Sequence, residues 1–364
     1  MNGGLSPAAT GALVLAIIAV VQGIFLLLLV VFVVVRRGYD RRQRAAFLAA
    51  RAGIEAPMRA WLVAGASPEP VVAALRTLPR GTAVGFVSLL ARRMIPAHNL
   101  AELAISLRGE RWVADVIARS GSRFWWRRLE AARALALVAG ERERPLVRKL
   151  LDDPHPAVQI AAASALPRVA DVATLGHLFD RLPQLPKVVR HFLPSVLRAT
   201  RTLGGPELAR RIRESTTREM LAALIELASA IDDPEGIAAA LGRADHPEAA
   251  VRRTVADALR RRPGPETVAV LRRLVGDSDA TVRAAAARTL GEVAGPEAAP
   301  LLAPLLSDRA WMVRLRAAIA LAQGGERGRA LLRVAREGPD RFARDMAAMV
   351  SGLSDGALLE LGDR

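Results

Sequence analysis

Side chains that could hold a metal or act as a nucleophile are few and scattered in this sequence. There is no cysteine, and the five histidines lie far apart, without the H-x-x-x-H or H-E-x-x-H spacing of a metal site. Neither phosphate-binding pattern, G-x-x-x-x-G-K-[ST] or G-x-G-x-x-G, occurs. Two adjacent carboxylate pairs, Asp152 with Asp153 and Asp232 with Asp233, each precede a proline, which is typical of turns and helix caps. We therefore expect no catalytic residue, no metal and no cofactor.

Composition and charge narrow the class of partner. Of the 364 residues 52% are hydrophobic, which excludes intrinsic disorder, and 52 Lys and Arg against 36 Asp and Glu give a net charge of +16. The excess lies in residues 36–150, with 22 basic and 9 acidic side chains, whereas residues 151–364 have 30 and 27. A surface that stacks on bases needs aromatic groups, and only 4% of the residues are aromatic. We therefore expect no nucleic-acid partner.

The first 35 residues contain no charged side chain. Within them residues 13–35 form an apolar run of 23, interrupted only by Gln22 and Gly23. A helix of this length spans about 34 Å, enough for a hydrocarbon core of about 30 Å. Because a basic start and a small-residue cleavage site are both lacking, we expect a retained transmembrane helix instead of a signal peptide.

The orientation follows from the arginines directly after this run. They are Arg36, Arg37, Arg41, Arg42 and Arg44. By the positive-inside rule, residues 1–12 form a short extracytoplasmic N-terminus and everything after residue 35 lies in the cytoplasm. We thus expect a single-pass protein of the inner (cytoplasmic) membrane, with 36–44 as a basic juxtamembrane segment that contacts anionic lipid headgroups.

Small residues follow one face of the predicted span. Ala12, Ala16, Ala19 and Gly23 are spaced 4, 3 and 4 residues apart, and Gln22 lies beside them. Such faces bring transmembrane helices into close contact. This face is a candidate for packing against another helix, either of a membrane partner or of a second copy of the chain; the alternative is that the helix is a plain anchor.

The rest of the chain is organised by a repeat. A phrase of the form V-R-x-x-A-A-x-x-L recurs every 31 residues, and its first position falls at Arg127, Val158, Val189, Met220, Val251, Val282 and Val313. Positions 0, +4 and +8 share one stripe of a helix. A turn precedes each such helix, and another apolar helix, such as Pro265–Val275, precedes the turn. The sequence therefore predicts an all-α protein in which helix–turn–helix units stack into an α-solenoid.

This unit resembles the HEAT repeat, and in particular the short HEAT-like repeats of bacteria that also occur in phycobilin lyases. The resemblance is carried by an aspartate in the turn and a basic residue six positions later, as in Asp277 with Arg283 and Asp308 with Arg314. In HEAT-like folds such pairs form a polar ladder along the stack. The pattern degenerates over 184–228, where Pro194 lies inside a second helix and is expected to kink it.

The domain organisation follows from the phase of the repeat. Residues 45–121 contain short helices that do not keep the phase, so we expect an irregular helical cap there. Residues 122–364 are expected to form the HEAT-like repeats. A last helix over Ala357–Leu361 is expected to close the final layer.

A solenoid presents a concave surface lined by its second helices, and such folds use that surface for binding. We expect its exposed positions at +2 and +6 of the phrase. Two adjacent tryptophans point about 100° apart on a helix, so one is expected to fill the junction with the cap and the other to act as a contact anchor. The candidate partner-binding residues are Arg133, Arg253, Asp257, Arg288, Leu315, Trp125 and Trp126.

The resemblance is to membrane-anchored HEAT-repeat proteins of bacteria. It implies a scaffold that holds a protein partner at the cytoplasmic face of the membrane, among membrane glycosyltransferases or other envelope-building enzymes. The alternative is a HEAT-like enzyme of phycobilin-lyase or DNA-glycosylase type. That alternative requires acid and base groups that converge on the concave face.

Overall fold

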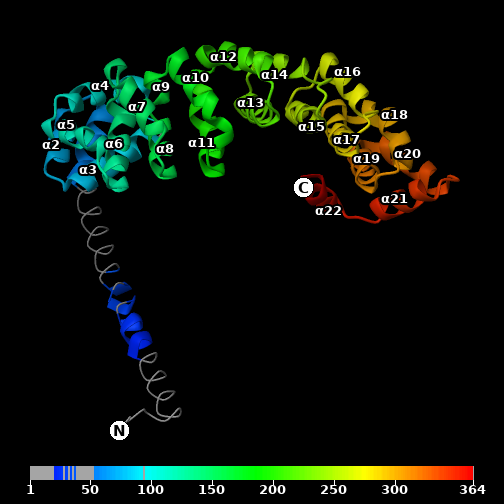
Figure 1. Ribbon diagram of the computed structural model, residues 1–364, viewed down its shortest axis with the longest axis horizontal. Helices are drawn as coiled ribbons and strands as arrows, with labels where there is room; N and C mark the ends of the chain where they lie inside the picture. The colour runs from blue at the N-terminus through cyan, green and yellow to red at the C-terminus, as the bar shows by residue number, and fades with distance from the viewer. Residues whose placement is uncertain are drawn as a thin grey trace, which may run out of the picture. The chain divides into compact units, whose positions relative to one another are not determined.

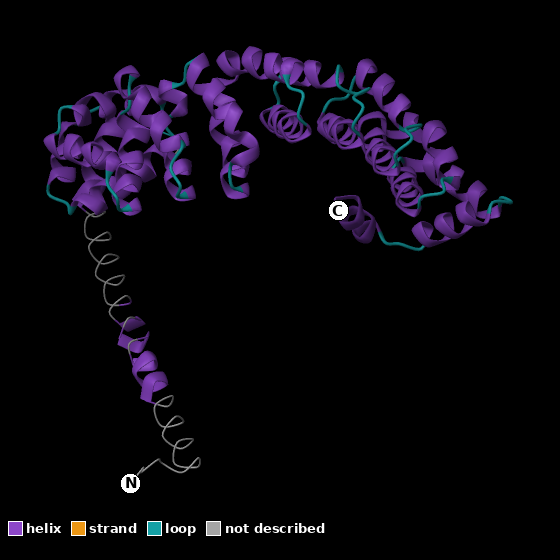
Figure 2. Cartoon of the chain, in the orientation of Figure 1, coloured by secondary structure: helices purple, strands orange, loops and turns teal. Residues whose placement is uncertain are grey.

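The computed structural model describes residues 20–27, 29–31, 33, 34, 37, 53–92 and 95–363. Every regular element in these ranges is a helix (Figures 1 and 2). The chain divides into two compact units, Met1–Gly121 and Ser122–Arg364, here called the first and second units.

The N-terminal helix is described only in part. The apolar side chains between residues 20 and 34 that are described are 44–67% exposed, and a Cβ added at Gly23 would meet no atom within 4 Å. In the ranges given above, no helix is both long enough and apolar enough to cross a membrane. Residues 1–19, 28, 32, 35, 36 and 38–44 lie outside those ranges, and with them Ala12, Ala16 and Ala19. The span at 13–35, its packing face and the segment 36–44 stay predictions.

Short helices form the rest of the first unit. They are a helix over 53–64, α2 (Glu69–Arg76), α3 (Arg80–Arg92), α4 (Ala97–Arg108), α5 (Arg111–Ile117) and a 3-10 turn, Ala118–Gly121. Their apolar faces meet around Trp61, which is fully buried. Arg76 of α2 donates two hydrogen bonds, of 2.8 and 2.5 Å, to the carboxylate of Glu110 at the start of α5.

Helices of the second unit lie in two rows (Figure 1). The first helices of the repeats are α7 (Arg144–Leu151), α10 (Val172–Arg181), α12 (Arg201–Glu214), α14 (Pro234–Leu241), α16 (Pro265–Leu274), α18 (Ala299–Leu302) and α20 (Gly325–Glu337). The second helices are α6 (Trp125–Val138), α8 (Pro156–Ala163) with α9 (Leu166–Val169), α11 (Lys187–Leu197), α13 (Arg218–Ile231), α15 (Ala249–Ala258), α17 (Ala280–Ala294), α19 (Trp311–Gln323) and α21 (Arg341–Ser351). Short 3-10 segments connect them at Glu141–Glu143, Leu182–Gln184, Arg198–Thr200, Leu259–Arg261, Gly295–Ala298 and Ala303–Ser307. Each second helix packs on the next one along the row, as α13 does on α15 and α17 on α19.

Burial within the second helices confirms the phase read from the sequence. At position +4 every residue from Ala131 to Ala317 is 0% exposed, and at +8 every residue from Leu135 to Leu321 is at most 2% exposed. Position 0 is buried in five of the seven repeats and departs from this at Arg127 and Met220. The stripe forms the contact between neighbouring repeats, and its +4 position is alanine in four of the seven repeats and leucine or valine in the other three.

A ladder of arginines and aspartates connects the turns of the second unit. Arg128, Arg252, Arg283 and Arg314 stand at the second position of the phrase. Each donates from Nη1 to the backbone carbonyls five and six residues earlier, over 2.7–3.1 Å. The first three also bind, through Nε and Nη2, the carboxylate 25 residues later, over 2.5–3.0 Å.

The pairing predicted within each repeat is therefore corrected. The guanidinium of Arg283 contacts Asp277 at its backbone carbonyl and not at its carboxylate. The carboxylate that it binds is that of Asp308 in the next turn. The carboxylate of Asp277 pairs with Arg252 of the preceding repeat. A guanidinium group has two donor edges, so one arginine can hold its own turn and the next turn together. Arg314 is the last of the series, and its guanidinium lies 4.7 Å from the ring centre of Phe342.

The middle of the second unit, residues 184–228, does not continue the ladder. The phrase position that carries arginine elsewhere is Gln159 in one repeat and Leu221 in another, and Arg190 between them makes no ion pair with any described residue. Pro194 lies inside α11, which stays helical to Leu197. Other contacts join the repeats here: Arg198 donates to the Ala230 carbonyl over 2.9 Å, Arg201 donates to the Asp232 carbonyl over 3.0 Å, and Arg211 of α12 forms an ion pair with Asp180 of α10.

The last helix, α22 (Asp355–Asp363), differs in position from the expectation for the end of the chain. It packs against α19, the second helix before α21, on the inner side of the second helices (Figure 1). It therefore covers part of the surface that the second helices line.

Candidate partner-binding surface

Four of the five residues predicted for the concave face reach the surface, and one does not. Arg133 and Arg253 are exposed, and Asp257 and Arg288 are half-buried. Leu315 is only 7% exposed, so it is not available to a partner as predicted. Its helix, α19, packs against α17, α20, α21 and α22, which leaves less free surface than the helices earlier in the row have.

Ion pairs connect neighbouring second helices across this face. Arg288 of α17 donates from Nη2 to Asp257 of α15 over 2.6 Å. Arg260, just after α15, donates from Nε to both carboxylate oxygens of Glu292 of α17, over 2.8 and 3.0 Å. These pairs join residues 31 and 32 positions apart, so they run along the stack as the ladder does.

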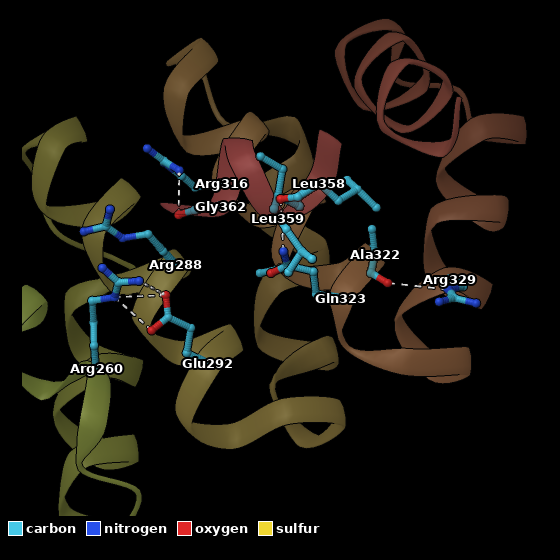
Figure 3. Close-up of a pocket in the computed structure, with 12 residues that line it drawn as sticks. Arg260, Arg288, Glu292, Arg316, Ala322, Gln323, Arg329, Leu358, Leu359 and Gly362 are labelled. Atoms are coloured by element: carbon cyan, nitrogen blue, oxygen red, sulfur yellow. Dashed lines mark hydrogen bonds and ion pairs between the residues drawn. The ribbon is translucent and has the colours of Figure 1, made fainter. Parts of the chain in front are cut away.

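Two adjacent cavities hollow this face, and they share Arg260 and Glu292. Figure 3 shows these two residues in the lining of one of the cavities. The first, of about 470 Å³, lies over α13 and α15 and is lined by Glu226, Arg253 and Asp257 among others. The second, of about 530 Å³, lies over α17 and α19 and extends to α22. We call the two together the groove. Six arginines and three carboxylates line it: Arg253, Arg260, Arg261, Arg288, Arg316, Arg329, Glu226, Asp257 and Glu292.

Arg316 of α19 is the central cation of the second cavity. Its Nη1 donates to the backbone carbonyls of Leu361, over 2.6 Å, and Gly362, over 3.4 Å (Figure 3). Burial lowers the pKa of this guanidinium, and the positive charges of Arg288 and Arg260 lower it further. Four arginines and one carboxylate line this cavity, so it has an excess of positive charge that favours an anionic group.

The two tryptophans at the start of α6 do not divide their roles as predicted. Trp125 is 40% exposed and stacks on His155 of the following turn, with ring centres 4.0 Å apart. Trp126 is 49% exposed and stacks on Phe124 at 4.6 Å. Neither is a buried core residue, because both rings lie at the first turn of α6 and face the loops beside it. They remain candidate contact residues, at the edge of the second unit and apart from the groove.

Sequence reasoning missed several residues that shape the groove, among them Arg260, Arg316 and Gln323. Arg316 had a partial signal. It stands at +3 of the phrase, where four of the other six repeats have a small residue, alanine or threonine, that is 6–8% exposed. A G-x-S-x-G pattern at 352–356 was also overlooked. It lies between two helices, and its Ser354 Oγ accepts a hydrogen bond from the Ala357 N–H at the start of α22, which is a capping role.

Comparison with known proteins adds the family. The family model for HEAT repeats matches residues 113–192, 205–283 and 272–352, together more than half of the chain. This chain belongs to the HEAT-repeat family. The first gap in the match, 193–204, falls in the part of the HEAT repeats that lacks the ladder. No curated protein matches the chain.

Several solved structures resemble this HEAT-repeat chain. An engineered protein is 19% identical, with 79% of this chain and 90% of that chain covered and a TM-score of 0.34. YibA of Escherichia coli is 12% identical, with coverages of 72% and 99% and a TM-score of 0.35. Human deoxyhypusine hydroxylase in complex with glycerol is 19% identical, with coverages of 75% and 96% and a TM-score of 0.28.

Among the described residues, no group of three or more His, Asp or Glu side chains could hold a metal ion.

Proposed function

We propose that this HEAT-repeat protein is a scaffold that binds a protein partner in the groove of its second unit. The observation that carries this is the groove itself, a continuous surface over four second helices, lined by six arginines and three carboxylates. A lining of both signs, with cations in excess, complements an acidic protein surface. Arginine is also the charged residue most often found where interfaces gain their binding energy.

We further propose that the N-terminal helix holds the scaffold at the membrane, with the solenoid in the cytoplasm. Supporting this are the apolar run at 13–35, the arginines that follow it and the exposed apolar side chains in the described part of that helix. A membrane-associated partner, such as a glycosyltransferase or another envelope-building enzyme, is then within reach of the groove. A reporter fused after residue 364 should be active only in a form that works in the cytoplasm, and activity of a periplasmic form would contradict the orientation.

An enzyme on the same face is the other class considered. It requires acid and base groups that converge, but two of the three carboxylates of the groove, Asp257 and Glu292, are engaged with arginines at 2.6–3.0 Å, which leaves Glu226 without a second carboxylate to act with it. Ion pairing of this kind suits recognition better than acid–base catalysis, and this is the reason the scaffold is preferred.

Recovery of the partner from solubilised membranes tests the proposal. Arg253 and Arg261 line the groove and are exposed, so Arg253→Glu with Arg261→Glu should leave the fold intact and reduce the recovered partner by about tenfold or more. The matched control is Arg327→Glu with Arg336→Glu. Both arginines are exposed and lie on α20, which belongs to the row of first helices, and neither of them lines the groove. Equal recovery with the groove variant and the control variant would contradict the proposal.

A further inference from the structure

The groove already holds a helix. Leu358 of α22 is 7% exposed where the helix meets α19, whereas the adjacent Leu359 is 64% exposed. Gln323 of α19 donates from Nε2 to the Leu358 carbonyl over 3.1 Å, and Arg316 donates to the carbonyls of Leu361 and Gly362 (Figure 3). The contacts that fix α22 thus consist of one leucine and a set of backbone carbonyls.

The carbonyls of Leu361 and Gly362 belong to the last turn of α22. The final carbonyls of a helix have no partner inside it, and together they carry a partial negative charge. Arg316 supplies the donor and the positive charge that such an end requires. Because the contact is to backbone atoms, it recognises the C-terminal end of a helix and not a particular sequence.

The groove has charged side chains and open volume that α22 does not occupy. Arg260 and Arg288 line the same cavity as Leu359 and Gly362 of α22, and about 530 Å³ of open volume lies among these residues. Arg260 pairs with Glu292 and Arg288 with Asp257, whereas Arg316 donates to backbone carbonyls of α22. Four arginines and one carboxylate line the cavity, so a helix with acidic side chains would complement it and fill this volume.

Several features make α22 a replaceable occupant. It has nine residues, and isolated helices of that length are marginal in water. It buries one leucine and leaves its neighbour exposed. Its advantage is its tether: it follows α21 after a short loop, so its local concentration at the groove is high.

We propose that α22 is an internal ligand of the groove, and that the partner binds as an amphipathic helix that takes its place. The partner helix presents a leucine to α19, its C-terminal turn to Arg316 and Gln323, and acidic side chains to the cavity, where arginines outnumber carboxylates. This inference rests on the function proposed above, because it specifies what the groove recognises. Displacement of α22 is then the step that opens the groove to the partner.

A peptide-binding measurement on the full chain in detergent tests this. The probe is a fluorescent peptide with the sequence of residues 352–363, and a scrambled peptide of equal composition is its control. Leu358→Asp places a charge at the buried contact and should release α22, whereas Leu359→Asp makes the same change at an exposed position and should not. We expect the Leu358→Asp chain to bind the probe about tenfold more tightly than the wild type or the Leu359→Asp chain, since the tethered α22 no longer competes.

Two further readouts keep the test decisive. Adding Arg316→Gln to the Leu358→Asp chain should weaken probe binding by about tenfold, because the donor to the helix end is lost. Hydrogen exchange should show residues 355–363 protected in the wild type and unprotected in Leu358→Asp, with residues 249–351 unchanged. Equal probe binding by all three chains, or exchange of residues 355–363 in the wild type at the rate of the free peptide, would overturn the inference.

The outcomes separate this inference from the proposed function. If partner recovery depends on Arg253 and Arg261 but the probe does not bind the Leu358→Asp chain, the groove binds the partner in another way and only this inference fails. If the probe binds as expected but the amount of recovered partner changes neither with the groove arginines nor with the release of α22, the proposed function fails.

Discussion

Repeats in the region 249–323 are joined by buried arginine–aspartate pairs between their turns, whereas those around 184–228 lack these ladder pairs and are joined by arginines that donate to backbone carbonyls and by the ion pair of Arg211 with Asp180. In the former, Arg252 pairs with Asp277 and Arg283 with Asp308, and all four side chains are at most 13% exposed. In the latter, Arg198 and Arg201 donate to carbonyl groups of the next repeat. Arg243 likewise donates to the Ile212 carbonyl of the repeat before it, over 2.9 Å.

Close packing between first helices also helps to join the repeats around 184–228. A Cβ added at Gly205 of α12 would lie 2.5 Å from Oδ1 of Asp233, a buried carboxylate that caps α14 by accepting from the Gly236 N–H over 2.6 Å. The stack is therefore continuous where the sequence repeat is not. Ladder pairs require arginine and aspartate at fixed spacing, but a carbonyl group is present at every residue, so the middle tolerates a degenerate sequence.

The largest difference in stability between the two regions is expected when the arginine at the second position of the phrase is replaced by alanine in each. Arg283→Ala leaves Asp308 buried without its cation and should lower the free energy of unfolding of its region by about 3–5 kcal/mol. Arg190→Ala removes a side chain that pairs with no described residue, and its effect should stay within about 0.5 kcal/mol. Urea unfolding of the full chain, with hydrogen exchange to locate the change, measures both. An effect of Arg190→Ala as large as that of Arg283→Ala would show that the ladder is not what distinguishes the regions.

A smaller effect is expected from adding a methyl group to the middle region. Gly205→Ala brings Cβ against the buried carboxylate of Asp233, which cannot move without losing the α14 cap, and should cost about 1–3 kcal/mol. The control is Gly85→Ala in α3, where no atom lies within 4 Å and alanine should stabilise the helix by up to about 1 kcal/mol. If thermal unfolding shows Gly205→Ala to be stabilising as well, close approach does not hold the middle repeats.

The smallest expected effect is a response to acid with opposite signs in the two regions. The hydrogen bond from Arg252 lowers the pKa of Asp277, whereas burial raises the pKa of Asp233. Stability from a carboxyl group with a lowered pKa is present above its unfolded pKa and is lost as pH falls through the folded value. A carboxyl group with a raised pKa destabilises the fold when ionised, and that penalty disappears as pH falls.

Lowering the pH from about 6 to about 3.5 should therefore weaken residues 249–323 while relieving the α12–α14 contact. Hydrogen-exchange protection, normalised to unstructured peptides at each pH, measures the two responses. Asp277→Asn should reduce the acid response of its region, because Asp279 and Asp308, whose pKa values are also lowered, still respond. The same sign of change in both regions would contradict the assignment of the two carboxyl groups.

Much of the fold could be predicted from the sequence, because the 31-residue spacing of small and apolar residues directly determines which stripe of each second helix is buried. Asp277 and Arg283 were recognised as ladder residues, but their partners were assigned within one repeat. The true pairing depends on the distance between neighbouring turns, which spacing along the chain does not contain.

The candidate site could be predicted only in outline. Arg253, Asp257 and Arg288 were found because exposed positions follow from helical periodicity. Leu315 was misplaced because its burial depends on how many helices surround α19, a property of the assembled stack. The position of α22 was missed for a similar reason: its contacts are to backbone carbonyls, which leave no mark in its sequence.

Site-specific photocrosslinking in membranes tests the central claim, partner binding in the groove, most directly. A photoreactive side chain replaces Arg261, which is exposed and lines the groove, or Arg327, which is exposed on α20. The account predicts one protein crosslinked to the chain from position 261 and not from 327, with a higher yield when Leu358→Asp releases α22. Crosslinking to that protein from position 327 alone, or from neither position while the partner still co-purifies, would contradict it.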